Sequence, residues 1–144
     1  MEVTCSTIIM KSKQVLSIEQ MQHLQELGLD TSNASMRWLN YNGINAVIPN
    51  NFHLPTTDKD YKICDAYTLQ DVMELLPHID GCQLSLGIDC DPKMIWYEDV
   101  KSLDESGYET DGTISFIGDT MLEVAYKSLV WAIKEGYLET DKHK

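Results

Sequence analysis

The densest set of potential metal ligands in this chain is a short acidic turn, Asp89-Cys90-Asp91, followed by Glu98 and Asp99. Carboxylate oxygens are ligands for hard cations such as Ca²⁺. A calcium loop, however, places its oxygen ligands at fixed alternate positions with a glycine bend and a closing glutamate, and this run lacks that order. The four histidines and four cysteines show no zinc-ligand spacing either. The sequence therefore predicts no metal site and no cofactor.

Nucleophilic catalysis would need a cysteine beside a base, and the chain offers Cys64 and Cys90 as nucleophiles with His53 and His78 as bases. No local motif links these residues, and their pattern favours buried structural thiols. Four carboxylates that could do acid–base work crowd one polar loop: Asp104, Glu105, Glu109 and Asp111. That loop has no apolar surroundings to raise a carboxylate pKa into a useful range. We therefore expect a protein that is not an enzyme.

Charge is the most informative bulk property of the chain. The 144 residues include 23 Asp and Glu against 11 Lys and Arg, which gives a formal net charge of −12. Only one basic residue is an arginine, Arg37. Affinity for a nucleic-acid backbone or an anionic membrane depends on Lys and Arg, so direct binding to either is not expected. The charge fits either a solvated surface or an acidic face for a basic protein partner.

Aromatic and acidic residues in two segments are the candidates for contact with a partner. Exposed aromatic residues beside acids suit a protein interface, whereas aromatic residues packed in a core serve stability. We expect core packing for most of them, and any that remain exposed would mark the binding face. The candidate partner-binding residues are Trp38, Tyr41, Phe52, Trp96, Tyr97, Glu98, Asp99 and Tyr108.

Three helices are predicted by a repeated start signal. In each, a Ser or Thr is followed three residues later by Gln, Asp or Glu, which is the pattern of a capping box, and apolar residues follow at helical spacing. The helices are expected to begin at Ser17, Thr68 and Thr120 and to end near Gly28, Pro77 and Gly136.

Strands are expected mainly between residues 82 and 100. Apolar and polar residues alternate over 82–89, a turn at Asp91-Pro92 interrupts them, and the pattern resumes over 93–100. A third, short strand is expected over 113–117. Residues 40–60 are rich in Asn, Pro, Thr and Asp, so we expect a long loop with at most short strands, which is a candidate interaction surface.

These elements predict a single α+β domain over residues 1–138, followed by a frayed polar tail over 139–144. The small antiparallel sheet consists of the hairpin 82–100 plus further short strands. We expect it to pack against two or three helices, chiefly those that begin at Thr68 and Thr120.

Cysteine usage and hydropathy indicate where the protein acts. The four cysteines are scattered without a Cys-x-x-Cys pair, and the first residues lack the apolar region of a signal peptide. The apolar stretches are shorter than the roughly 20 residues that span a bilayer. We expect reduced thiols, a cytoplasmic location and no association with a membrane.

Three segments, 16–30, 66–77 and 129–138, resemble a group of uncharacterised small acidic proteins encoded by phages and mobile elements of gut bacteria. The resemblance covers all three predicted helices. It implies a genomic setting rather than an activity or a catalytic residue.

Together these features predict a non-enzymatic protein-binding accessory protein of a phage or mobile element, which inhibits or adapts a host protein. Two alternatives stay open. One is a small-ligand-binding protein or hydrolase with a carboxylate-lined pocket, and the other is an acidic mimic of nucleic acid. The identity of the partner and the oligomeric state are left open by the sequence.

Overall fold

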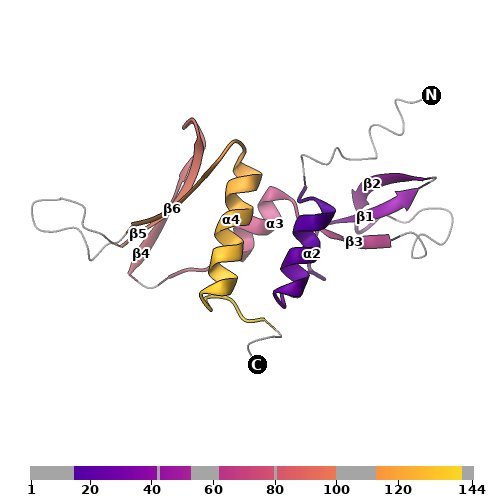
Figure 1. Ribbon diagram of the computed structural model, residues 1–144, viewed down its shortest axis with the longest axis horizontal. Helices are drawn as coiled ribbons and strands as arrows, with labels where there is room; N and C mark the ends of the chain where they lie inside the picture. Colours follow the sequence, from indigo (N-terminus) through magenta and orange to yellow (C-terminus); the bar gives the residue numbers. More distant parts are fainter. Residues whose placement is uncertain (1–14, 42, 53–61, 80, 100–112, 141–144) are drawn as a thin grey trace, which may run out of the picture. The chain divides into compact units, whose positions relative to one another are not determined.

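The computed structural model describes residues 15–41, 43–52, 62–79, 81–99 and 113–140 (Figure 1). The chain divides into two compact units, residues 1–74 with 139–144 and residues 75–138. Each unit holds one three-stranded antiparallel sheet, and three helices lie within the described residues. The predicted α+β fold is therefore confirmed. The prediction of a single domain over residues 1–138 stays a prediction.

The first unit contains a sheet that the sequence analysis did not predict. Its strand order is β2-β1-β3, with both pairs antiparallel. A six-residue strand starts at Ile44, within residues 40–60, where we expected a long loop with at most short strands, and residues 53–60 lie outside the described residues. The strands are β1 (Met36–Tyr41), β2 (Ile44–Pro49) and β3 (Lys62–Ala66).

An Asn-Gly pair explains why this segment turns back into a hairpin. Tyr41 pairs directly with Ile44, so the connection has only two residues. Gly43 has a φ of 82°, the left-handed conformation that such tight turns require and that glycine adopts without a steric penalty. Two-residue hairpin loops favour this dipeptide for that reason.

Helix α2 (Ile18–Glu26) and helix α3 (Leu69–Leu75) begin as predicted. The Ser17 hydroxyl accepts from the Gln20 amide, and the Gln20 side chain accepts from the Ser17 amide. Thr68 and Asp71 exchange the same pair of hydrogen bonds at 3.1 and 3.0 Å. These reciprocal contacts satisfy amides that have no partner within the helix.

Helices α2 and α3 both make contacts within the first unit. Helix α2 packs against β3 of the first unit. All but the last residue of α3 belongs to the same unit, where the Asp71 carboxylate accepts from the Ser35 amide and hydroxyl at 3.0 and 2.6 Å. The capping carboxylate of α3 thus contacts the segment before β1. The prediction that the helix beginning at Thr68 packs against the hairpin sheet stays a prediction.

The second unit contains the predicted hairpin and the predicted third strand. The strand order is β4-β5-β6, and both pairs are antiparallel. Helix α4 packs against β5 and β6, as expected for the helix that begins at Thr120, and Figure 1 shows it lying along the sheet. The elements are β4 (Cys82–Gly87), β5 (Lys93–Asp99), β6 (Thr113–Gly118) and α4 (Met121–Lys134).

Both ends of α4 follow from its sequence. Thr120 accepts from the Glu123 amide at 3.1 Å, whereas the Glu123 carboxylate accepts from the Asp119 amide rather than completing the expected box with Thr120. At the other end Gly136 has a φ of 82°, and the Tyr137 amide donates to the Ala132 carbonyl at 2.9 Å. This is the left-handed termination that helix-ending glycines favour.

The described part of the tail differs from the prediction. Thr140 is 3% exposed, and residues 139 and 140 belong to the first unit. The chain thus enters the second unit once and returns to the first. Residues 141–144 lie outside the described residues. None of the described helices is long and apolar enough to cross a membrane.

Candidate functional site: the open face of the β4-β5-β6 sheet

Strand pairing sorts the side chains of the second sheet onto two faces, because directly paired residues point to the same side and successive residues alternate. The face that contacts helix α4 carries Ile95 and Tyr97 of the central strand, both buried. We call the other one the open face. It consists of Gln83, Ser85 and Gly87 of β4, Met94, Trp96 and Glu98 of β5, and Ser115 and Ile117 of β6.

Aromatic packing fixes which face belongs to α4. The Trp131 ring of α4 lies 5.6 Å from the Tyr97 ring and 5.6 Å from the Phe116 ring, centroid to centroid. The Tyr97 hydroxyl donates to the Pro77 carbonyl at 3.0 Å, and burial raises the pKa of Tyr97 to about 12. Such tilted rings at this spacing stabilise a core beyond the area they bury. Tyr97 therefore serves the core of this unit.

Trp96 stands at the centre of the open face and is partly exposed. It is paired with Ser85 on one side and with Ser115 on the other. Both neighbours are short hydroxyl side chains, and Ser115 is exposed. The indole ring is thus flanked across the strands by small polar groups.

An apolar pair extends the centre of this face. Met94 is paired with Ile117 on β6 and with Gly87 on β4. The Ile117 side chain is 51% exposed and Met94 is partly exposed. Ile117 is also a diagonal neighbour of Trp96, within the reach of a large aromatic side chain. Met94, Trp96 and Ile117 therefore form one apolar centre with Gln83 and Glu98 at its margin.

The β6 edge of the sheet is occupied by a lysine from α4. The Lys127 amine donates to the Ile117 carbonyl at 2.8 Å and lies 3.6 Å from the Glu123 carboxylate. A lysine at an edge strand discourages pairing with another strand, because it blocks a backbone acceptor and brings a charge. The open face, rather than this edge, is thus the part of β6 that is available for contact.

The predicted site residues of the first unit lie in different environments. Trp38 is 5% exposed, and its indole N–H donates to the Leu16 carbonyl at 2.8 Å. Phe52 is partly buried against a small apolar cluster of Leu39, Ala46 and Ile48. Tyr41 is 41% exposed and is paired with Ile44 at the end of the hairpin. Of these three aromatic residues, only Tyr41 offers a largely exposed side chain.

The acidic candidates do not converge on one site. Glu98 lies on the open face, and Asp99 is paired with Cys82 at the end of β5. Tyr108 and the four acids of the loop 104–111 lie outside the described residues, as does His53. Within the described ranges, no group of three or more His, Cys, Asp or Glu residues is arranged to hold a metal ion.

The cysteines correct one expectation. Cys64 is buried, as predicted, and desolvation raises the pKa of its thiol to about 11. Cys90 is exposed rather than buried, because it lies in the turn after β4 has ended at Gly87. Cys64, Cys82 and Cys90 are all free thiols.

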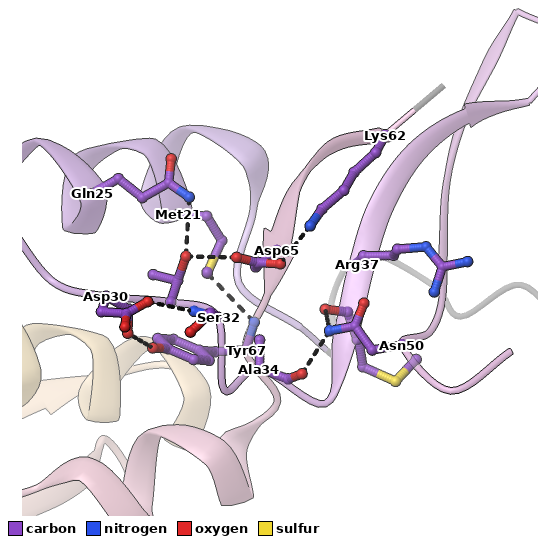
Figure 2. Close-up of polar contacts among 12 residues, drawn as sticks. Met21, Gln25, Asp30, Ser32, Ala34, Arg37, Asn50, Lys62, Asp65 and Tyr67 are labelled. Carbon is purple, nitrogen blue, oxygen red and sulfur yellow. Dashed lines mark hydrogen bonds and ion pairs between the residues drawn. The ribbon is translucent and has the colours of Figure 1, made fainter. Parts of the chain in front are cut away.

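Polar side chains in the first unit form a network that is used for structure (Figure 2). The Thr31 hydroxyl donates to the Asp65 carboxylate at 2.8 Å and accepts from the Gln25 amide at 3.0 Å. The Lys62 amine lies 2.9 Å from the same carboxylate. Thr31 is only 4% exposed. These contacts join α2, the segment before β1 and strand β3.

Two further contacts hold the same segment in place. The Tyr67 hydroxyl lies 3.0 Å from the Asn33 side-chain oxygen and 3.3 Å from the Asp30 carbonyl, and burial raises the pKa of Tyr67. The Asn50 amide group donates to the Ala34 and Met36 carbonyls at 2.6 and 3.0 Å. These interactions leave the network with a structural role.

Ser85, Met94, Ser115 and Ile117 belong to the candidate face but were missed by the sequence analysis. Their signal was the alternation within residues 93–97, where Met94 and Trp96 share one face and Ile95 and Tyr97 share the other. Trp96 and Tyr97, although adjacent in sequence, therefore lie on opposite faces of the sheet.

Comparison with models of protein families, with curated proteins and with solved structures finds no match for this chain.

Proposed function

We propose that this chain is a non-enzymatic accessory protein of a phage or mobile element of gut bacteria, and that it acts in the cytoplasm by binding a host protein through the open face of the second unit. The genomic setting rests on the resemblance of its three helical segments. The binding role rests on the open face and the charge.

The observation that carries the proposal is the apolar centre formed by Met94, Trp96 and Ile117. The face toward α4 buries Ile95 and Tyr97 at its centre and leaves Leu86 and Ile114 43% and 41% exposed. The open face leaves Ile117 51% exposed beside a partly exposed tryptophan at its centre. Protein interfaces combine an apolar, aromatic centre with a polar rim. The open face has this composition, since Gln83 and Glu98 border its apolar centre.

The charge distribution favours a basic partner. Residues 75–138 contain twelve of the 23 acidic residues and four of the 11 basic ones, so two thirds of the net charge of −12 belongs to this unit. None of the residues that form the open face is Lys or Arg. A second copy of the chain would bring the same negative charge and be repelled, whereas a basic protein would be attracted.

A capture experiment with a matched pair of variants tests the proposal. Ile117→Lys and Ile44→Lys make the same change at two exposed isoleucines, one on the open face and one in the first unit. We expect wild type and Ile44→Lys to retain a common basic protein from a gut-bacterial lysate and Ile117→Lys to lose it. Capture should weaken markedly between 50 and 300 mM salt, on the order of tenfold. Equal retention of the protein by both variants would contradict the proposal.

A further inference from the structure

We propose that the partner presents an arginine side chain to the open face and that its guanidinium group stacks on the indole ring of Trp96. This inference rests on the proposed function and names the chemistry of its central contact.

The surroundings of Trp96 suit a flat cation. The ring belongs to the central strand, and its two cross-strand neighbours are Ser85 and Ser115. Directly paired residues have Cβ atoms roughly 4.5 to 5.5 Å apart, so Ser85 and Ser115 flank Trp96 across the two neighbouring strands. A guanidinium over the indole could therefore donate to an oxygen on either side. A tryptophan face attracts cations more strongly than the other aromatic rings do.

The charges of the face agree with this occupant. Glu98 follows Trp96 by two residues and lies on the same face, and no Lys or Arg shares that face. The three described lysines of this unit lie elsewhere, Lys93 on the opposite face of β5 and Lys127 and Lys134 on α4. An incoming cation thus meets an aromatic ring, hydroxyl oxygens and a carboxylate.

Arginine fits these groups better than lysine. A guanidinium is planar, is weakly hydrated and carries five N–H donors, so it can stack on a ring and donate sideways at the same time. An ammonium is a compact, strongly hydrated charge that gains less from a flat ring bordered by acceptors.

Peptide titration tests the inference directly. The probes are a nine-residue peptide of alternating glycine and arginine and the same peptide with lysine at each arginine position. Affinity is measured by isothermal titration calorimetry, which also serves for variants without the indole. The contact is located by the NMR signal of the Trp96 indole N–H, assigned by its disappearance in Trp96→Phe. We expect the arginine peptide to move this signal and to bind several-fold tighter than the lysine peptide.

Variants separate stacking from general apolar contact. Trp96→Leu keeps an apolar side chain but removes the ring, and we expect it to weaken binding of the arginine peptide by about tenfold. Trp96→Phe keeps a ring and should retain most of the binding, which also guards against loss of folding in the leucine variant. The double variant Ser85→Ala with Ser115→Ala should reduce the preference for arginine over lysine. Equal binding of the two peptides, or undiminished binding by Trp96→Leu, would overturn the inference.

The same variants distinguish this inference from the proposed function. If a captured partner is lost by Ile117→Lys but fully retained by Trp96→Leu, the open face binds the partner without an arginine on the ring, and only the inference fails. If both variants retain the partner as wild type does, the proposed function itself is wrong.

Discussion

The two sheets have the same size and the same antiparallel pairing, yet they use their faces differently. In β1, the central strand of the first sheet, four consecutive residues, Met36 to Leu39, are buried, so both faces of that strand are covered. In β5, the central strand of the second sheet, Ile95 and Tyr97 are buried while Trp96 between them is partly exposed. A strand that is buried on both faces contributes to stability and has no accessible face. A strand whose side chains alternate between buried and exposed has one face that can bind a partner.

The first sheet, whose central strand is covered on both faces, also carries a buried charged side chain. Arg37 is 7% exposed, and its guanidinium donates to the Pro49 and Phe52 carbonyls at 2.9 and 2.7 Å. Lys127, beside the open sheet, is largely exposed and donates to a single carbonyl. The only arginine of the chain is thus used to fix a turn, and its charge is not displayed for binding.

The largest expected difference in stability is between alanine variants of Trp38 and Trp96, the tryptophans on the central strands of the two sheets. Trp38→Ala should lower the free energy of unfolding by about 3 to 5 kcal/mol, because it leaves a cavity and an unpaired Leu16 carbonyl. Trp96→Ala should cost about 1 kcal/mol or less, since its ring is partly solvated. Urea denaturation followed by circular dichroism measures both. Similar losses for the two variants would contradict the distinction between β1, which is buried on both faces, and β5, which is buried on one.

A second pair compares the two cations. Arg37→Ala should cost about 3 kcal/mol, because two carbonyls lose a charged donor in a buried site. Arg37→Lys should recover part of this loss, since one amine can reach only part of the fork geometry. Lys127→Ala should cost no more than about 0.5 kcal/mol, as for other exposed ion pairs. Urea denaturation decides the order, and a Lys127 variant as unstable as the Arg37 variant would contradict the comparison.

The helix boundaries and the hairpin were predictable because local chemistry determines them. The Ser17–Gln20 and Thr68–Asp71 pairs form their capping boxes within four residues of chain, and Gly136 ends α4 as its position indicated. The alternation over 82–89 likewise predicted β4. Such signals need no knowledge of distant contacts.

The first sheet was missed because two local signals disagreed. The abundant asparagines of residues 40–51 indicated a loop, whereas the Asn42-Gly43 pair between Tyr41 and Ile44 indicated a hairpin. The Asn50 side chain donates to two backbone carbonyls at the open end of the hairpin. This asparagine therefore stabilises the hairpin and does not disrupt strand pairing. Pairing of β3 with β1 depends on residues far apart in sequence, so no short window predicts it.

A smaller loss of stability is expected when a hydroxyl group is removed from each unit, at Thr31 in the first and at Ser115 in the second. Thr31→Val should cost about 1 kcal/mol, because the buried Thr31 hydroxyl is lost and the partly buried Asp65 carboxylate and the exposed Gln25 amide lose their shared partner. Thr31→Ser should restore most of the stability, since it keeps the hydroxyl. Ser115→Ala, on the open face, should change the free energy of unfolding by no more than about 0.5 kcal/mol. A Thr31→Val variant as stable as wild type would remove the structural role assigned to the network.

The smallest effect concerns the dependence of stability on pH, which comes from buried ionisable groups in both units. Burial raises the pKa of Cys64 in the first unit from 9.0 to about 11, and that of Tyr97 in the second from 10.0 to about 12. A group whose pKa is higher in the folded protein contributes its full stabilisation below its unfolded pKa and loses it as pH rises toward the folded value. The Cys64 contribution should therefore decline between about pH 9 and 11, and the Tyr97 contribution only above about pH 10.

Cys64→Ala isolates the contribution of the buried thiol to this pH dependence. In urea denaturation at pH 8, 9.5 and 10.5, wild type should lose stability progressively, and the variant should lose less over the same interval. Cys90→Ala serves as the matched control, because Cys90 is exposed in the folded protein and its removal should leave the slope of stability against pH unchanged. If both variants show the wild-type slope of stability against pH, burial does not raise the pKa of the Cys64 thiol. Strand β3 would then be more exposed to solvent than the structure shows.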